Sequence, residues 1–61
     1  MMLNYLVTFR RLSDREMLPF KIRAWDKRDA IETGVARLAE RFTDFVERDA
    51  WQLHSVNRTE P

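Results

Sequence analysis

The sequence predicts a small two-layer α+β domain of ββαβ order, in which a three-stranded antiparallel sheet packs on one helix. Residues 3–12 and 18–25 alternate apolar and polar side chains with the period of two that half-buried strands show. Residues 27–43 instead carry apolar side chains at helical spacing, and residues 50–57 return to alternation. A helix that crosses over after a hairpin most simply brings the third strand beside the first. We therefore expect the sheet order 2-1-3, with residues 3–12 in the centre.

The two N-terminal strands are expected to form a hairpin. In the first strand, the side chains that share the inner face are Leu3, Tyr5, Val7 and Phe9. The polar residues 13–16 contain no glycine, so we expect a loop of a few residues rather than a tight two-residue turn. In the second strand, Phe20, Ile22 and Ala24 share one face. Pro19 lacks an amide donor, and this indicates an edge strand.

The helix is expected to begin after Asp26, whose carboxylate can accept a hydrogen bond from the amide of Asp29. Its apolar stripe consists of Ala30, Ile31, Gly34, Val35, Leu38, Ala39 and Phe42. Gly34 weakens a helix by about 1 kcal/mol relative to alanine, so we expect it to allow close approach to the sheet, with a helix hinge as the alternative. The helix should end between Phe42 and Glu47, because residues 43–49 fit either a helix extension or a loop.

The third strand is predicted to place Trp51 and Leu53 on the inner face and Gln52, His54 and Val56 on the outer face. The polar residues 57–61 are expected to fray. The predicted core brings together side chains of the sheet and the helix: Tyr5, Val7, Phe9, Phe20, Ile22, Trp51 and Leu53 against Ile31, Val35, Leu38 and Phe42.

Composition predicts one marginally stable domain. The 61 residues include no cysteine, so no disulfide supplements the core, and a chain of this length buries only ~60% of its unfolded surface. The net charge of +1, from 11 bases and 10 acids, disfavours a general binder of polyanions. Neither a membrane-length apolar run nor a signal peptide is visible, so we expect a cytoplasmic protein without membrane contact.

The sequence lacks the groupings that catalysis uses. It contains no cysteine, no glycine-rich phosphate loop and no serine in a nucleophile-elbow context. His54 is the only histidine, and the carboxylates near it show no metal-ligand spacing. Asp26 and Asp29 are explained by helix capping, and Glu47 and Asp49 by a solvated loop. We therefore expect no enzyme, no cofactor and no metal.

The outer face of the sheet has no cover within this fold, and every ionisable side chain expected there is basic or histidine. This assignment depends on register, because a slip of one residue would exchange the two faces. The residues we expect to contact a partner on this face are Leu6, Arg10, Lys21, Arg23, Trp25 and His54.

Three interpretations of the outer face remain open. In the first, it is a solvated face with some half-exposed apolar residues, as antiparallel sheets commonly have. In the second, it is a protein-contact surface, either for a foreign partner or for a homodimer, because tryptophan and arginine often dominate interface energy. In the third, it is a nucleic-acid surface, with arginines on phosphates and Trp25 stacking on a base. The leading hypothesis is protein binding, with Trp25 as the desolvated anchor, and nucleic-acid binding is the alternative.

The chain resembles a pattern in small phage and mobile-element proteins. In that pattern an extended segment ends in an alanine and a helix cap, and an Ala-Ile pair and a final strand follow. Here the pattern runs Tyr5-x-Val7, Phe20-x-Ile22-x-Ala24-Trp25-Asp26-x-x-Asp29-Ala30-Ile31 and Trp51-x-Leu53-x-x-Val56. In size and layout the chain is similar to some anti-CRISPR proteins. That resemblance implies a non-enzymatic inhibitor that occludes a surface of a host effector complex in the host cytoplasm. Many anti-CRISPR proteins are strongly acidic, and this chain is not, which counts against nucleic-acid mimicry and leaves occlusion of a surface open. No motif allows functional residues to be transferred.

Overall fold

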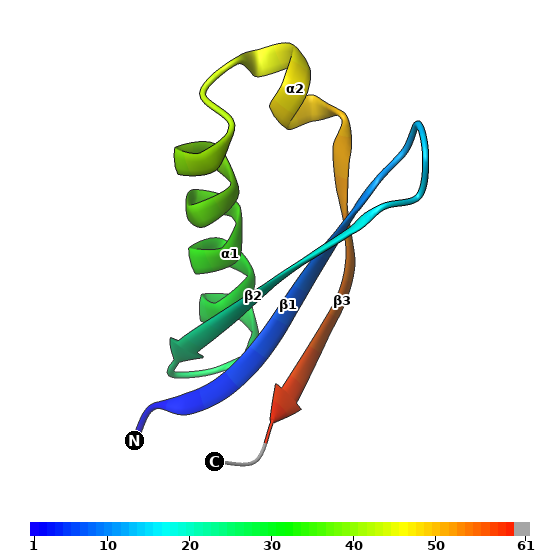
Figure 1. Cartoon of the computed structure of the whole chain (residues 1–61). Coiled ribbons are helices and arrows are strands. Elements are labelled where there is room, and N and C mark those ends of the chain that lie inside the picture. Colours follow the sequence, from blue (N-terminus) through cyan, green and yellow to red (C-terminus); the bar gives the residue numbers. More distant parts are fainter. Residues whose placement is uncertain (60–61) are drawn as a thin grey trace.

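The fold is an α+β domain with three strands and two helices, and the computed structural model describes residues 1–59. In chain order the elements are β1 (Leu3–Arg11), β2 (Met17–Ala24), α1 (Lys27–Arg41), α2 (Phe45–Asp49) and β3 (Trp51–Thr59). Figure 1 shows α1 along one side of a strongly twisted sheet, with α2 joining the end of α1 to the start of β3. The molecule is elongated, with extents of 36 × 20 × 15 Å.

The predicted topology is confirmed. The sheet order is β2-β1-β3, and β1 pairs antiparallel with both neighbours. The β1–β2 register is regular from Leu3 opposite Ala24 to Arg10 opposite Met17. Side chains therefore alternate between the two faces along the whole hairpin. Pro19 lies on an edge strand, as predicted.

The core lies between the inner face of the sheet and α1. Its buried members are Tyr5, Val7, Phe9, Ile22, Ala24, Ala30 and Leu38. The inner face of the hairpin was predicted correctly, but the helix contact differs from the prediction. Gly34 and Leu38 are buried, whereas Val35 is 48% exposed. The reason is that α1 packs mainly against β2, so the side of its stripe that faces β3 lacks full cover.

The close approach predicted at Gly34 is confirmed. A Cβ atom added to this glycine would lie 2.8 Å from Cγ1 of Val7, which is itself fully buried. Glycine therefore lets the backbone of α1 sit directly on the central strand. Glycine has a low intrinsic helix propensity. At this position it allows a short distance between the helix and the sheet.

Both ends of α1 are capped. The amide of Asp29 donates to Oδ1 of Asp26 at 2.8 Å, as predicted, and the amide of Trp25 donates to Oδ2 of Asp29 at 2.9 Å. Trp25 lies outside β2, which ends at Ala24 opposite Leu3 rather than at residue 25. At the other end, the Phe42 amide donates to the Leu38 carbonyl at 2.9 Å. The helix ends at Arg41, before the predicted range.

The segment after α1 is neither a simple extension nor a loop. Asp44 begins a separate short helix, α2, and its carboxylate accepts a hydrogen bond from the Glu47 amide at 3.4 Å. Ala50 forms the C-terminal cap of α2, so β3 begins at Trp51 rather than at residue 50. Asp44 is thus explained by capping, and Glu47 and Asp49 lie in this short helix rather than in the solvated loop that was predicted.

A bulge in β3 corrects the predicted placement of two residues. Thr8 lies opposite Ser55 and Phe9 opposite Leu53, so His54 is the extra residue in the β1–β3 ladder. The bulge shifts the alternation by one residue. Val56 consequently lies opposite Val7 and packs against the core, and it is not on the outer face as predicted. β3 also continues to Thr59, two residues beyond the predicted end.

The hairpin tip is organised by Arg11, with which β1 ends. Its guanidinium forms ion pairs with Asp14, at 2.7 Å, and with Glu16, and it lies 5.2 Å from the ring centre of Trp51. The Arg11 guanidinium lowers the pKa of the Asp14 carboxyl to about 2, with help from the hydrogen bond donated by the Glu16 amide. Arg15 adopts φ = 63°, the left-handed conformation that the glycine-free loop requires.

Candidate binding surface

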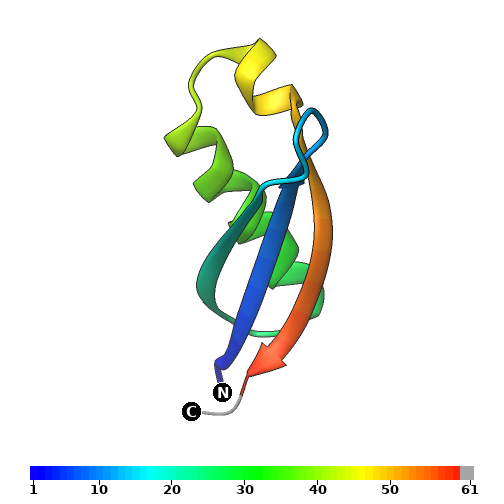
Figure 2. The same cartoon turned by 45° about the vertical axis from the view of Figure 1, so that its right-hand side comes forward.

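The face of the sheet opposite α1 carries no element of the described chain, and we call it the open face. Figure 2 shows α1 behind the sheet and the open face toward the viewer. The strand pairing and the alternation of side chains assign twelve residues to it: Asn4, Leu6, Thr8, Arg10, Met17, Pro19, Lys21, Arg23, Gln52, Ser55, Asn57 and Thr59.

The open face is basic. Its ionisable side chains are Arg10, Lys21 and Arg23, and the twelve strand residues assigned to it include no acid. Within residues 1–59 none of these three cations forms an ion pair, since the pairs that are present involve Arg11 and Arg28. No acidic side chain of residues 1–59 neutralises their charge by direct contact.

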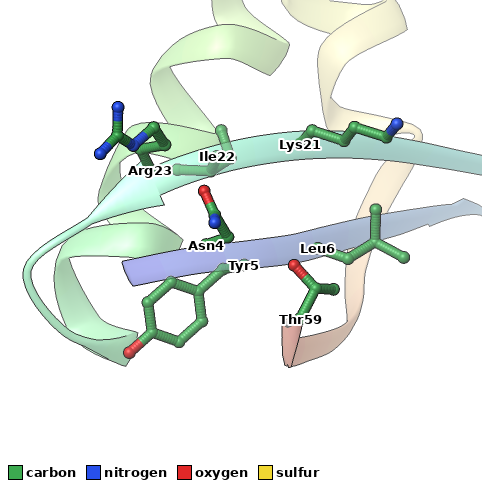
Figure 3. Close-up of a pocket in the computed structure, with 7 residues that line it drawn as sticks. All are labelled: Asn4, Tyr5, Leu6, Lys21, Ile22, Arg23 and Thr59. Atoms are coloured by element: carbon green, nitrogen blue, oxygen red, sulfur yellow. The ribbon is translucent and has the colours of Figure 1, made fainter. Parts of the chain in front are cut away.

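A shallow hollow of about 430 Å³ lies at one end of the open face. Figure 3 shows Lys21 and Arg23 along β2, with Asn4 and Leu6 beside them on β1. Thr59 borders the hollow from β3, while Tyr5 and Ile22 complete its lining. The register explains this grouping, because Asn4 lies opposite both Arg23 and Thr59, and Leu6 lies opposite Lys21.

The structure brings together only some of the predicted partner-binding residues. Leu6, Lys21 and Arg23 line the hollow, but Arg10 lies farther along the face, opposite Met17 and Gln52. Trp25 follows the end of β2 and is 62% exposed, so it is not one of the strand residues of the open face, and it does not line the hollow. The predicted role of Trp25 as an anchor remains a prediction.

His54 is also not at the regular outer-face position that simple alternation predicted. It is the exposed bulge residue of β3, and it does not line the hollow. Conversely, Thr59 was not among the predicted site residues, because it lies beyond residue 57, the predicted end of the third strand. The polar composition after Val56 gave no signal for two further strand residues. Only the pairing with β1 shows that Thr59 reaches the hollow.

The chemistry of the hollow is that of anion recognition. Lys21 and Arg23 supply charged donors, Asn4 and Thr59 supply neutral polar groups, and Leu6 supplies an apolar surface. An arginine beside a lysine can bind a carboxylate or a phosphate oxygen through charge-assisted hydrogen bonds. Within residues 1–59, no three histidine, cysteine or acidic side chains come together as a metal ion would require.

Fold and surface together define a small two-layer domain with a basic, uncovered sheet face. No protein-family model, no curated protein and no solved structure matches the chain. None of the helices in residues 1–59 has the length and apolar character to cross a membrane.

Proposed function

We propose that this protein is a non-enzymatic binding module whose open face binds an acidic surface of another protein. The observation that carries the proposal is that the twelve strand residues of that face include no acid and three bases, none of which forms an ion pair within residues 1–59. Carboxylates of a partner would be favoured at Arg10, Lys21 and Arg23, while acids elsewhere in the domain keep the total charge near zero. Such local complementarity favours specific over general attraction.

The composition of the open face supports a protein partner over nucleic acid. Sequence-tolerant binding of single strands uses aromatic side chains on which bases stack. The twelve strand residues of the open face include no aromatic side chain, and exposed Trp25 lies beyond the end of β2. Nucleic-acid binding by the same bases is the alternative. It would show affinity that falls steeply with salt as counterions are released.

A narrower role also remains a prediction. An inhibitor encoded by a phage or mobile element, of the anti-CRISPR type, would use the open face to occlude a site on a host complex. The resemblance in size and layout motivates this role, and the basic face is compatible with an acidic target. The binding experiment identifies the target and so tests both levels of the proposal.

The test is affinity capture of the tagged protein from a bacterial lysate, with and without nuclease treatment. The variant Lys21→Glu/Arg23→Glu reverses two charges at the hollow. Its matched control, Lys27→Glu/Arg37→Glu, makes the same change in net charge at exposed positions of α1. We expect a protein partner that survives nuclease, is bound at least ~10-fold more weakly by the hollow variant and is retained by the control.

Each other outcome has a definite meaning. A partner lost only after nuclease treatment would replace the proposal with nucleic-acid binding. Equal loss in both double variants would show that net charge, not the open face, governs binding. Full retention by the hollow variant, or no partner under any condition, would reject the proposed surface and favour a solvated face.

A further inference from the structure

The two cations of the hollow point away from each other. Figure 3 shows the Lys21 ammonium group and the Arg23 guanidinium group directed toward opposite ends of β2. Their backbone positions lie two residues apart on one face of the strand, which corresponds to about 6.8 Å at ~3.4 Å per residue. A single carboxylate would contact one of these groups, so the pair fits a ligand that carries two separated anionic groups.

Arg10 extends the same line of charge along the hairpin. It lies opposite Met17, which is four residues from Lys21 on β2, so its level on the sheet is about 13.6 Å farther on at ~3.4 Å per residue. Because all extended chains share this repeat, a chain laid along the hairpin would meet Arg23, Lys21 and Arg10 at its positions i, i+2 and i+6. These steps are even, so the three side chains would project from one face of that chain.

The rest of the open face suits an extended segment better than a helix. A helix docks on a sheet through an apolar stripe, and the only apolar side chains among the twelve strand residues of the face are Leu6, Met17 and Pro19. An extended segment instead brings backbone N–H and C=O groups that need partners. Amide and hydroxyl side chains can both donate and accept such hydrogen bonds. Six residues of the face carry them: Asn4, Thr8, Gln52, Ser55, Asn57 and Thr59.

We propose that the open face binds an extended acidic segment of the partner protein, whose carboxylates at positions i, i+2 and i+6 contact Arg23, Lys21 and Arg10. This inference rests on the proposed function and narrows it, because an acidic surface of any shape would satisfy that function. Segments with many charges and few apolar side chains stay unfolded on their own. The occupant is therefore an acidic tail or linker, which is accessible without any rearrangement of the partner.

Two synthetic peptides of identical composition test the spacing. Thr-Glu-Thr-Glu-Thr-Ser-Thr-Glu-Thr carries carboxylates at i, i+2 and i+6, and both termini are blocked so that they add no charge. In Thr-Glu-Glu-Thr-Thr-Ser-Thr-Glu-Thr, one of the first two carboxylates lies on the opposite face of the extended chain. The two peptides have equal charge, so any difference between their affinities reports the spacing.

Each peptide is titrated into the labelled domain while its amide NMR signals are recorded. We expect the amides of β1 and β2 to shift more than those of α1, with a Kd on the order of 1 mM for the first peptide. Binding of the second peptide should be ~5-fold weaker, because it loses one exposed ion pair. The spectra also report whether each variant of the domain is folded.

Variants of the domain assign the carboxylates to their partners. Lys21→Glu/Arg23→Glu should remove the preference between the two peptides, whereas the control Lys27→Glu/Arg37→Glu should retain it. Arg10→Gln should weaken binding of the first peptide ~5-fold, by loss of one exposed ion pair. It should not affect a version of that peptide whose last glutamate is replaced by glutamine.

Equal affinity for the two peptides, or no amide shift with either at several times the expected Kd, would overturn the inference. The proposed function would still stand if a captured protein partner depended on Lys21 and Arg23. Tighter binding of an alanine-rich helical peptide with glutamates four residues apart would replace the extended occupant with a helix. Tighter binding of an oligothymidine of matching length would reject both the inference and the proposed function in favour of nucleic acid.

Discussion

The contact between Gly34 and Val7 allows the packing of α1 on the sheet to be tested quantitatively. Gly34→Ala should favour the helix by about 1 kcal/mol through its intrinsic propensity. The new methyl group would lie 2.8 Å from Cγ1 of Val7, whereas ordinary contact begins at 3.4 Å, so the two must separate by at least about 0.6 Å. Val7 is fully buried, and its branched side chain has few alternative rotamers. Such overpacking destabilises by ~1–3 kcal/mol, so the expected net effect is a loss of about 1 kcal/mol.

Urea unfolding followed by circular dichroism measures this effect, and Ala36→Gly is its matched control. Ala36 is an exposed position two residues farther along α1, so this variant reports helix propensity without the contact. A domain of this size has only ~3–5 kcal/mol of total stability, and a change of 1 kcal/mol is readily measured. Val7→Ala should itself cost about 2 kcal/mol.

The double variant isolates the contact. With Val7 shortened, Gly34→Ala should become stabilising by about 1 kcal/mol, giving a coupling free energy of ~1–3 kcal/mol. The reasoning would be refuted if Gly34→Ala stabilised the wild type by as much as Ala36→Gly destabilises it. Additive effects of the Gly34 and Val7 substitutions would refute it equally.

Two further predictions concern the cap and the hairpin tip. Asp26→Ala removes the acceptor of the Asp29 amide and should lower the free energy of unfolding by about 1 kcal/mol; an unchanged urea midpoint would contradict this. Asp14 should titrate with a pKa of about 2 in an NMR titration of its carboxyl, and Arg11→Gln should move that pKa toward 3.8. Because folding lowers this pKa, the contribution of the ion pair to stability is complete above pH 4 and is lost as the pH falls through 2. An Asp14 pKa near 3.8 in the wild type would show that the pair does not form in solution.

The sequence predicted the hairpin and its faces because a regular ladder obeys a period of two without exception. Arg10, Lys21 and Arg23 lie on the open face for that reason. The cap at Asp26 and the close approach at Gly34 were predictable for a different reason. Each is a local requirement that few residue types satisfy.

The remaining differences arise where long-range packing overrides local pattern. The bulge at His54 is set by pairing with β1, and no residue in its vicinity indicates it. The exposure of Val35 depends on how α1 is placed across the sheet, which periodicity does not encode. Trp25 lies beyond the last pair of the hairpin, Leu3 with Ala24, and its amide donates to the side chain of Asp29 instead of to a strand. These interruptions explain why the site is smaller than the set of residues predicted for it.

The central position of β1 also determines the order in which the sheet can assemble. Its partner β2 follows after five residues, whereas the paired residues Arg11 and Trp51 are forty positions apart. Closing the longer loop costs roughly 1.8 kcal/mol more free energy through lost chain entropy, from (3/2)RT ln(40/5). The hairpin can therefore form early and independently, and β3 joins it only when α1 has brought the chain back. We therefore expect β3 to be the last strand to be incorporated into the sheet.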